Sequence, residues 1–154
     1  MLSEGNSAPE FELESDGGGI IRLCDLKGKP VVVYFYPKDD TSGCTKEAIA
    51  FTELSGEFSN HGAHIIGISP DTVASHDKFK AKHNLDVQLA ADSGKVVVQA
   101  YGVWVKKNMY GRKYMGVERS TFLIDADGKI TQIWRKVKVP GHAEEVLEAL
   151  QSII

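Results

Sequence analysis

Cysteine is scarce in this sequence, which has only Cys24 and Cys44 among its 154 residues. Two cysteines are too few for a disulfide-stabilised scaffold in a chain of this length. In a reducing compartment an isolated cysteine is either a small buried hydrophobe or a reactive thiol. The residues that surround each thiol therefore decide between these two interpretations.

Long apolar runs are also absent. No segment approaches the roughly 20 apolar residues that a membrane-spanning helix requires. The opening residues, MLSEGN, lack both the basic region and the apolar stretch of a secretory signal. We therefore expect a cytoplasmic protein that does not act on membranes.

Neither sign of charge is in large excess, because 18 Lys and Arg oppose 21 Asp and Glu, for a net charge of −3. The basic residues are scattered, so no footprint for nucleic acid or anionic lipid is visible. Partners should be small molecules or proteins. The length, with no repeat or linker, predicts a single domain over residues 1–154. A monomer or weak dimer is expected.

Short β-branched and aromatic segments bounded by turn residues predict the strands of a sheet. Two of them flank residues 125–128 and should form an antiparallel hairpin. Residues 11–14 and 20–23 flank a glycine turn and predict an added N-terminal hairpin. The four central segments are residues 31–35, 64–68, 120–124 and 130–134.

Apolar residues at helical spacing predict helices over residues 44–58 and 142–154, and residues 72–82 are a shorter, polar helix candidate. The first has Ala48, Phe51, Leu54 and Phe58 on one face and would cross over between parallel strands. Together these elements predict an α/β fold with a central mixed β-sheet flanked by helices.

Cys44 follows an apolar strand and a polar loop, and it stands in the first turn of the expected helix. Unpaired backbone N–H groups and the positive end of the helix dipole stabilise negative charge at such a place. Cys44 is therefore expected to be a thiolate, which is the nucleophilic form of cysteine.

Residues 34–47, YFYPKDDTSGCTKE, resemble the active-site motif of peroxiredoxins, in which proline, three residues, threonine or serine, two residues and cysteine follow in order. Pro37, Thr41 and Cys44 match it. Residues 44–48 and 119–125 extend the resemblance to the peroxiredoxin Q group, also called bacterioferritin comigratory proteins, over nearly the whole chain. The resemblance implies a thioredoxin-like fold and a thiol-dependent peroxidase without metal, haem or flavin.

Attack on a peroxide bond requires an ionised sulfur, an oriented peroxide and a group that stabilises the departing oxygen. Cys44 would attack the O–O bond of hydrogen peroxide or an organic hydroperoxide and become a sulfenic acid. Thr41 would orient the peroxide, as the resemblance implies, and Arg119 would stabilise the thiolate and the charge that moves onto oxygen.

Three further residues should shape the pocket. Gly43 would supply a backbone N–H beside that of Cys44, and Pro37, which has no N–H, would close the pocket against water. Glu47, three residues after Cys44, would hold an arginine in place, which the resemblance also implies.

Cys44 and Arg119 also have interpretations that involve no catalysis. A lone cysteine is usually a small buried hydrophobe, and an arginine at the start of a strand is usually a solvated surface charge. For Cys44 and Arg119 only the surrounding motif favours the chemical interpretation.

Many members of the peroxiredoxin Q group have a resolving cysteine five residues after the cysteine that matches Cys44, but that position is Ile49 here. Cys24 is the only other thiol, and a disulfide requires Cα atoms within about 7 Å. We expect Cys24 to be buried core, and predict a one-cysteine cycle completed by thioredoxin, glutaredoxin or glutathione. A two-cysteine cycle with Cys24 as resolving thiol stays open.

Two other functions fit part of the sequence. A thioredoxin-like disulfide reductase usually needs a Cys-x-x-Cys pair, which this chain lacks. A non-enzymatic redox sensor or holdase would instead use oxidation of Cys44 to change its assembly or its partner.

Two remaining features have ordinary interpretations. His61 and His64 lack the further ligands of a zinc site, so no metal is expected. Residues 104–115 are interpreted as a solvated loop near the active site, with anion or partner binding as the alternative. The basic residues of this segment are Lys106, Lys107, Arg112 and Lys113.

Overall fold

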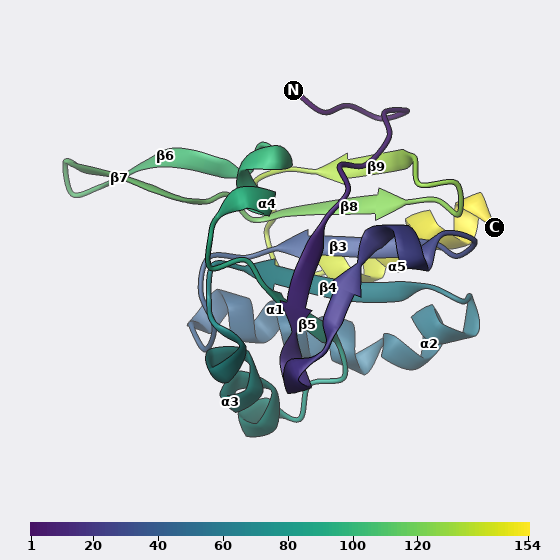
Figure 1. Ribbon diagram of the computed structural model, residues 1–154, viewed down its shortest axis with the longest axis horizontal. Coiled ribbons are helices and arrows are strands. Elements are labelled where there is room, and N and C mark those ends of the chain that lie inside the picture. The colour runs from purple at the N-terminus through teal and green to yellow at the C-terminus, as the bar shows by residue number, and fades with distance from the viewer.

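A computed structural model describes all residues from 1 to 154, and seven of its nine strands form one sheet (Figure 1). The strand order is β2-β1-β5-β4-β3-β8-β9. The strands are β1 (Glu12–Ser15), β2 (Ile20–Arg22), β3 (Val31–Phe35), β4 (His64–Ser69), β5 (Gln88–Ala91), β8 (Ser120–Ile124) and β9 (Ile130–Trp134).

The centre of the sheet is mixed, as expected. Strand β3 pairs parallel with β4 and antiparallel with β8, and β4 pairs parallel with β5. Because both faces of β3 are covered, all five of its residues are buried and the strand is a continuous apolar run. Val33 and Phe35 pack on one face, and Val32 and Tyr34 pack on the other.

Helices cover both faces of the sheet (Figure 1). Residues of α1, α2, α3 and α5 pack with Val32 and Tyr34, whereas α4 packs on the opposite face with Val33 and Phe35. None of the helices is long and apolar enough to cross a membrane. The helices are α1 (Ser42–Glu53), α2 (Ser55–Asn60), α3 (Val73–His83), α4 (Val96–Ala100) and α5 (His142–Ile153).

The expected single helix over residues 44–58 is wrong in one respect, because it is two helices that join at Leu54. Ser55 and Gly56 follow the break, and both residue types are poor helix formers. The Ser55 hydroxyl bonds the Asp86 carboxylate at 2.8 Å, which fixes the start of α2. The expected helices over 72–82 and 142–154 are confirmed as α3 and α5.

The predicted N-terminal hairpin is confirmed. Strands β1 and β2 pair antiparallel, with Glu12 opposite Arg22, and β1 extends the main sheet by pairing with β5. Between the two strands lies the short 3-10 helix η1 (Asp16–Gly18). The sequence pattern did not predict β5 or α4.

Residues 104–115 are not a loop, which corrects the expectation. They belong to a separate hairpin of β6 (Trp104–Met109) and β7 (Arg112–Val117), which projects from the body (Figure 1). Tyr110 and Gly111 both have positive φ, 53° and 77°, as the two central residues of a type I′ hairpin turn require. The strands are mostly exposed and carry charges, so they show no apolar periodicity.

Candidate active site

Cys44 lies in the first turn of α1 and is only 2% exposed. The chain leaves β3, passes through residues 37–41 and enters the helix at Ser42. The first helical hydrogen bond runs from the N–H of Thr45 to the carbonyl of Thr41, at 2.9 Å. The N–H groups of Gly43 and Cys44 therefore lie ahead of the helical ladder, where they favour a negative charge.

Arg119 reaches Cys44 from a segment that is distant in the sequence. It directly precedes β8, whose Ser120 is paired with Phe35 at the end of β3. Its Nη2 donates to Sγ of Cys44 at 3.4 Å, and its Nη1 donates to Oε1 of Glu47 at 2.7 Å. One guanidinium thus holds the sulfur and the carboxylate together, as expected from the sequence.

Glu47 is 1% exposed and has no hydrogen-bond partner for Oε2. Burial raises the pKa of Glu47 to about 7, even though the charge and hydrogen bond of Arg119 lower it. The Glu47 carboxyl group therefore changes charge near neutral pH, beside the arginine that contacts Cys44.

Gly43 makes room for this arginine. A Cβ atom at position 43 would lie 3.0 Å from Nη2 of Arg119, which is closer than ordinary side-chain contacts. The glycine therefore allows the guanidinium to lie against the first turn of α1, next to the thiol.

Thr41 is the N-cap residue of α1 and is exposed. Its hydroxyl donates to the carbonyl of Lys38 at 2.8 Å. In this arrangement the oxygen of Thr41 is free to accept a hydrogen bond but its proton is engaged. Pro37 lies half-buried between Tyr36 and Lys38, at the start of the same loop.

The β6–β7 hairpin contributes a second cation. Lys107 is half-buried on β6, with its aliphatic chain against Gly116. Burial and the positive charge of Arg119 lower the pKa of Lys107, although the nearby Cys44 and Glu118 raise it. The segment is thus close to the arginine of the site, although it is not a loop.

Cys24 is exposed, so its expected burial is wrong. It lies in the short 3-10 helix η2 (Leu23–Leu26), where Leu23 occupies the core. Partial desolvation and the carboxylates of Glu10 and Asp25 raise the pKa of Cys24, which keeps it in the less reactive thiol form.

The two cysteines lie at opposite ends of the same strand pair. Cys24 lines a cavity of about 100 Å³ with Val31 and Ile124, which are paired at one end of β3 and β8. Cys44 contacts Arg119, next to the pair at the other end. The strand between them spans about 13 Å at roughly 3.3 Å per residue. The strand length therefore supports a separation of the two thiols, whereas a disulfide requires Cα atoms within about 7 Å.

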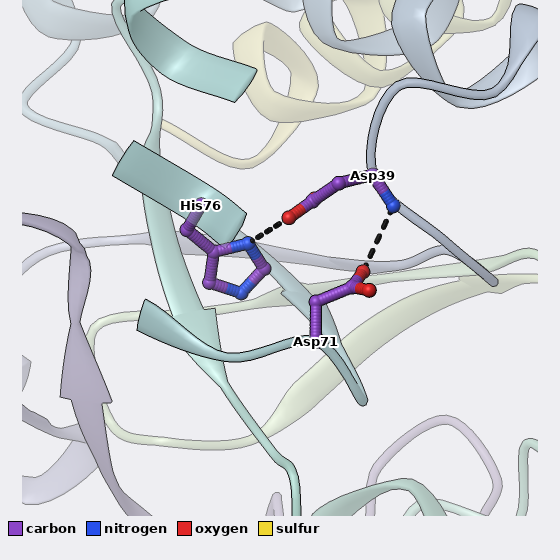
Figure 2. Close-up of side chains that lie close together, drawn as sticks. All are labelled: Asp39, Asp71 and His76. Atoms are coloured by element: carbon purple, nitrogen blue, oxygen red, sulfur yellow. Dashed lines mark hydrogen bonds and ion pairs between the residues drawn. The ribbon is translucent and has the colours of Figure 1, made fainter. Parts of the chain in front are cut away.

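A buried polar cluster beside the loop was missed from the sequence. Figure 2 shows Asp39, from the loop after β3, in contact with Asp71 and His76. Asp39 and Asp71 follow β3 and β4, which are parallel neighbours whose carboxyl ends meet at one edge of the sheet. This placement is the signal that could have predicted their approach.

A thioredoxin-like sheet, a buried thiol at a helix N-terminus and an arginine on its sulfur define a thiol-based redox protein. The sequence matches the AhpC/TSA family over residues 5–133. It is 48% identical to peroxiredoxin Bcp of Bacillus subtilis, covering 97% of this chain and 95% of that protein.

Solved structures agree with this match. A mutant of PrxQ from Xylella fastidiosa has a TM-score of 0.94 at 38% identity, covering 99% of this chain and 97% of the other. The bacterioferritin comigratory protein of Xanthomonas campestris has a TM-score of 0.88 at 45% identity, covering 92% and 90%. The chain belongs to the AhpC/TSA family, in its peroxiredoxin Q group, and is a thiol-dependent peroxidase.

Proposed function

We propose that Cys44 is the residue that reacts with peroxide. Its thiolate attacks one peroxide oxygen, an S–O bond forms as the O–O bond breaks, and water or an alcohol leaves after protonation. Cys44 becomes a sulfenic acid, two electrons having passed from sulfur to the peroxide. The observation that carries this proposal is the 3.4 Å hydrogen bond from Arg119 to the sulfur of Cys44.

In this proposal the groups around Cys44 stabilise charge and bind the peroxide. Arg119 stabilises the thiolate and the negative charge on the departing oxygen. The N–H groups of Gly43 and Cys44 bind the peroxide, and the Thr41 oxygen accepts a hydrogen bond from it. Pro37 offers no N–H that could compete for the thiolate.

The proposed cycle uses one cysteine of this chain. An external thiol attacks the sulfenic acid, releases water and forms a mixed disulfide, and a second thiol then frees Cys44. The separation of Cys24 from Cys44 along β3 supports this over an internal disulfide. Thioredoxin, glutaredoxin or glutathione would supply the thiols. We place this cycle in the reducing cytoplasm and assign it to a single-domain protein that is a monomer or weak dimer.

Hydrogen peroxide and organic hydroperoxides are the proposed substrates. The similar Xanthomonas campestris protein is described by its alkyl peroxide reduction activity. For this chain, Thr41 and Ser42 are exposed at the start of α1, so the proposed site opens to solvent beside Thr41.

Peroxide consumption by a Cys44→Ser variant in the presence of excess thiol tests the proposal. The variant should lose turnover while it keeps its circular dichroism spectrum and melting temperature. Cys24→Ser is the matched control and should keep turnover. Residual turnover in Cys44→Ser would contradict the proposal, and consumption of only one equivalent by the wild type would favour a redox sensor.

A further inference from the structure

Asp39 lies in the 37–41 loop, just before Thr41, yet it is only 7% exposed. Its carboxylate accepts three hydrogen bonds. Tyr36 Oη donates to Oδ1 at 2.6 Å, and Ser75 Oγ donates to Oδ2 at 2.8 Å. His76 Nδ1 also bonds Oδ2, at 2.7 Å (Figure 2). The middle of an otherwise polar loop is thereby fixed to the interior.

His76, on α3, is completely buried. Its Nδ1 faces the Asp39 carboxylate and its Nε2 faces the carbonyl of Ala90 at 3.0 Å. A carboxylate and a carbonyl accept hydrogen bonds, so this geometry favours a proton on both ring nitrogens, which is the imidazolium form. Burial lowers the pKa of His76, but the hydrogen bond and charge of Asp39, with the Ala90 carbonyl and the charge of Asp71, together raise it.

The third member of the cluster completes a hydrogen-bond network. Asp71 accepts the backbone N–H of Asp39 at 2.8 Å and the hydroxyl of Ser69 at 2.6 Å through the same oxygen. A cation at this place would need the lone pair of His76, which its second proton occupies. The cluster therefore fits an internal anchor better than a metal site.

Helix α3 also holds the next residue of the loop. Asp40 has a positive φ of 62° and accepts Lys82 Nζ at 2.7 Å and His83 Nε2 at 2.8 Å. Two successive aspartates thus attach the loop to α3, directly before Thr41, the N-cap residue of α1.

We propose that Asp39 and His76 are positioning residues, whose buried ion pair holds the 37–41 loop so that Thr41 can orient the peroxide against Cys44. The inference rests on the proposed function of Cys44. Neither residue contacts the thiol or the substrate; they act through the loop. The other charged or titratable groups that face His76 are Asp71 and Tyr36.

Four variants test the anchor: Asp39→Asn, His76→Gln, the two combined, and Lys80→Met. Lys80 lies on α3 but bonds Asp16 at 2.8 Å, away from the loop, and is the matched control. The rate constant with hydrogen peroxide is measured by stopped flow at a temperature where every variant is folded. Alkylation of Cys44 by iodoacetamide is measured in parallel.

Each single variant should lower the peroxide rate constant about tenfold, because it leaves one buried partner without its counterpart. The double variant should recover to within about threefold of the wild type, because two amides can bond each other without charge. Lys80→Met should react at the wild-type rate. Iodoacetamide alkylation should not slow, because it needs a thiolate but no oriented peroxide.

Wild-type peroxide rates in folded single variants would overturn the proposal, as would an equal fall in Lys80→Met. A parallel slowing of alkylation would also overturn it, since the pair would then act on the thiolate. The proposal would also be overturned if Zn²⁺ raised the melting temperature of the wild type but not of Asp39→Asn, because that result would indicate a metal site. Cys44→Ser, assayed alongside, separates the two proposals, because its residual turnover would contradict the role of Cys44 alone.

Discussion

Arg119 donates a hydrogen bond from Nη2 to the sulfur of Cys44 at 3.4 Å, across the junction between α1 and the start of β8. The two residues are 75 positions apart in the sequence. They meet because β8 pairs with β3, which places Arg119 beside the loop that leads to Cys44. Its other terminal nitrogen is held by Glu47, which fixes the plane of the guanidinium.

Arg119→Lys tests whether this geometry matters beyond charge. A lysine keeps the positive charge but cannot bond the sulfur and Glu47 through one rigid fork. We expect the rate constant with hydrogen peroxide to fall about 100-fold, as when a donor to a developing oxyanion is removed. The pH–rate profile measures it, and a profile that matches the wild type would remove Arg119 from the mechanism.

Glu47→Gln should change how stability depends on pH. The pKa of Glu47 is about 7 in the folded chain and its ordinary value is 4.5. Between these values the folded state holds a proton that the unfolded state lacks, so the free energy of unfolding falls as pH rises. The fall is at most about 3 kcal/mol, since one pKa unit corresponds to about 1.4 kcal/mol.

Urea unfolding from pH 4.5 to 7 measures this effect. The fall should be smaller in Glu47→Gln than in the wild type, because glutamine does not titrate. Glu53→Gln makes the same chemical change at an exposed site of α1 and should follow the wild-type curve. Identical curves for all three proteins would show that Glu47 titrates in its ordinary range.

Gly43→Ala should disturb the site without unfolding the chain. The added Cβ would lie 3.0 Å from Nη2 of Arg119, so this nitrogen, which donates to the Cys44 sulfur, must give by a few tenths of an ångström. We expect the peroxide rate to fall about tenfold, which is about 1.4 kcal/mol in the barrier. Gly56→Ala is the control, because a Cβ there meets nothing within 4 Å. Equal rates in both variants would mean that Arg119 tolerates the shift.

The sequence predicted the elements that a single strong pattern specifies. Strand β3 is a continuous apolar run and α5 carries a regular apolar stripe, and both are confirmed. The β6–β7 hairpin was interpreted as a loop because exposed, charged strands lack an apolar face. Its turn, in which Tyr110 precedes Gly111, was the one local signal.

The site was predictable where residues lie close in the chain and missed where the fold brings them together. Gly43, Cys44 and Glu47 share one helix turn, so their relation follows from helical spacing. Arg119 was selected by resemblance alone, since nothing local distinguishes it from a surface charge. The approach of His76 to Asp39 depends on how α3 packs against the loop, which no periodicity encodes.

The most direct test of the account is the intact mass of the reduced protein after one equivalent of hydrogen peroxide, with Cys24→Ser alongside. A gain of one oxygen, mapped to Cys44 in both proteins, is the expected result. A loss of two hydrogens in the wild type but not in Cys24→Ser would contradict the one-cysteine cycle and make Cys24 the resolving thiol. No rapid change in mass would contradict the role of Cys44 itself.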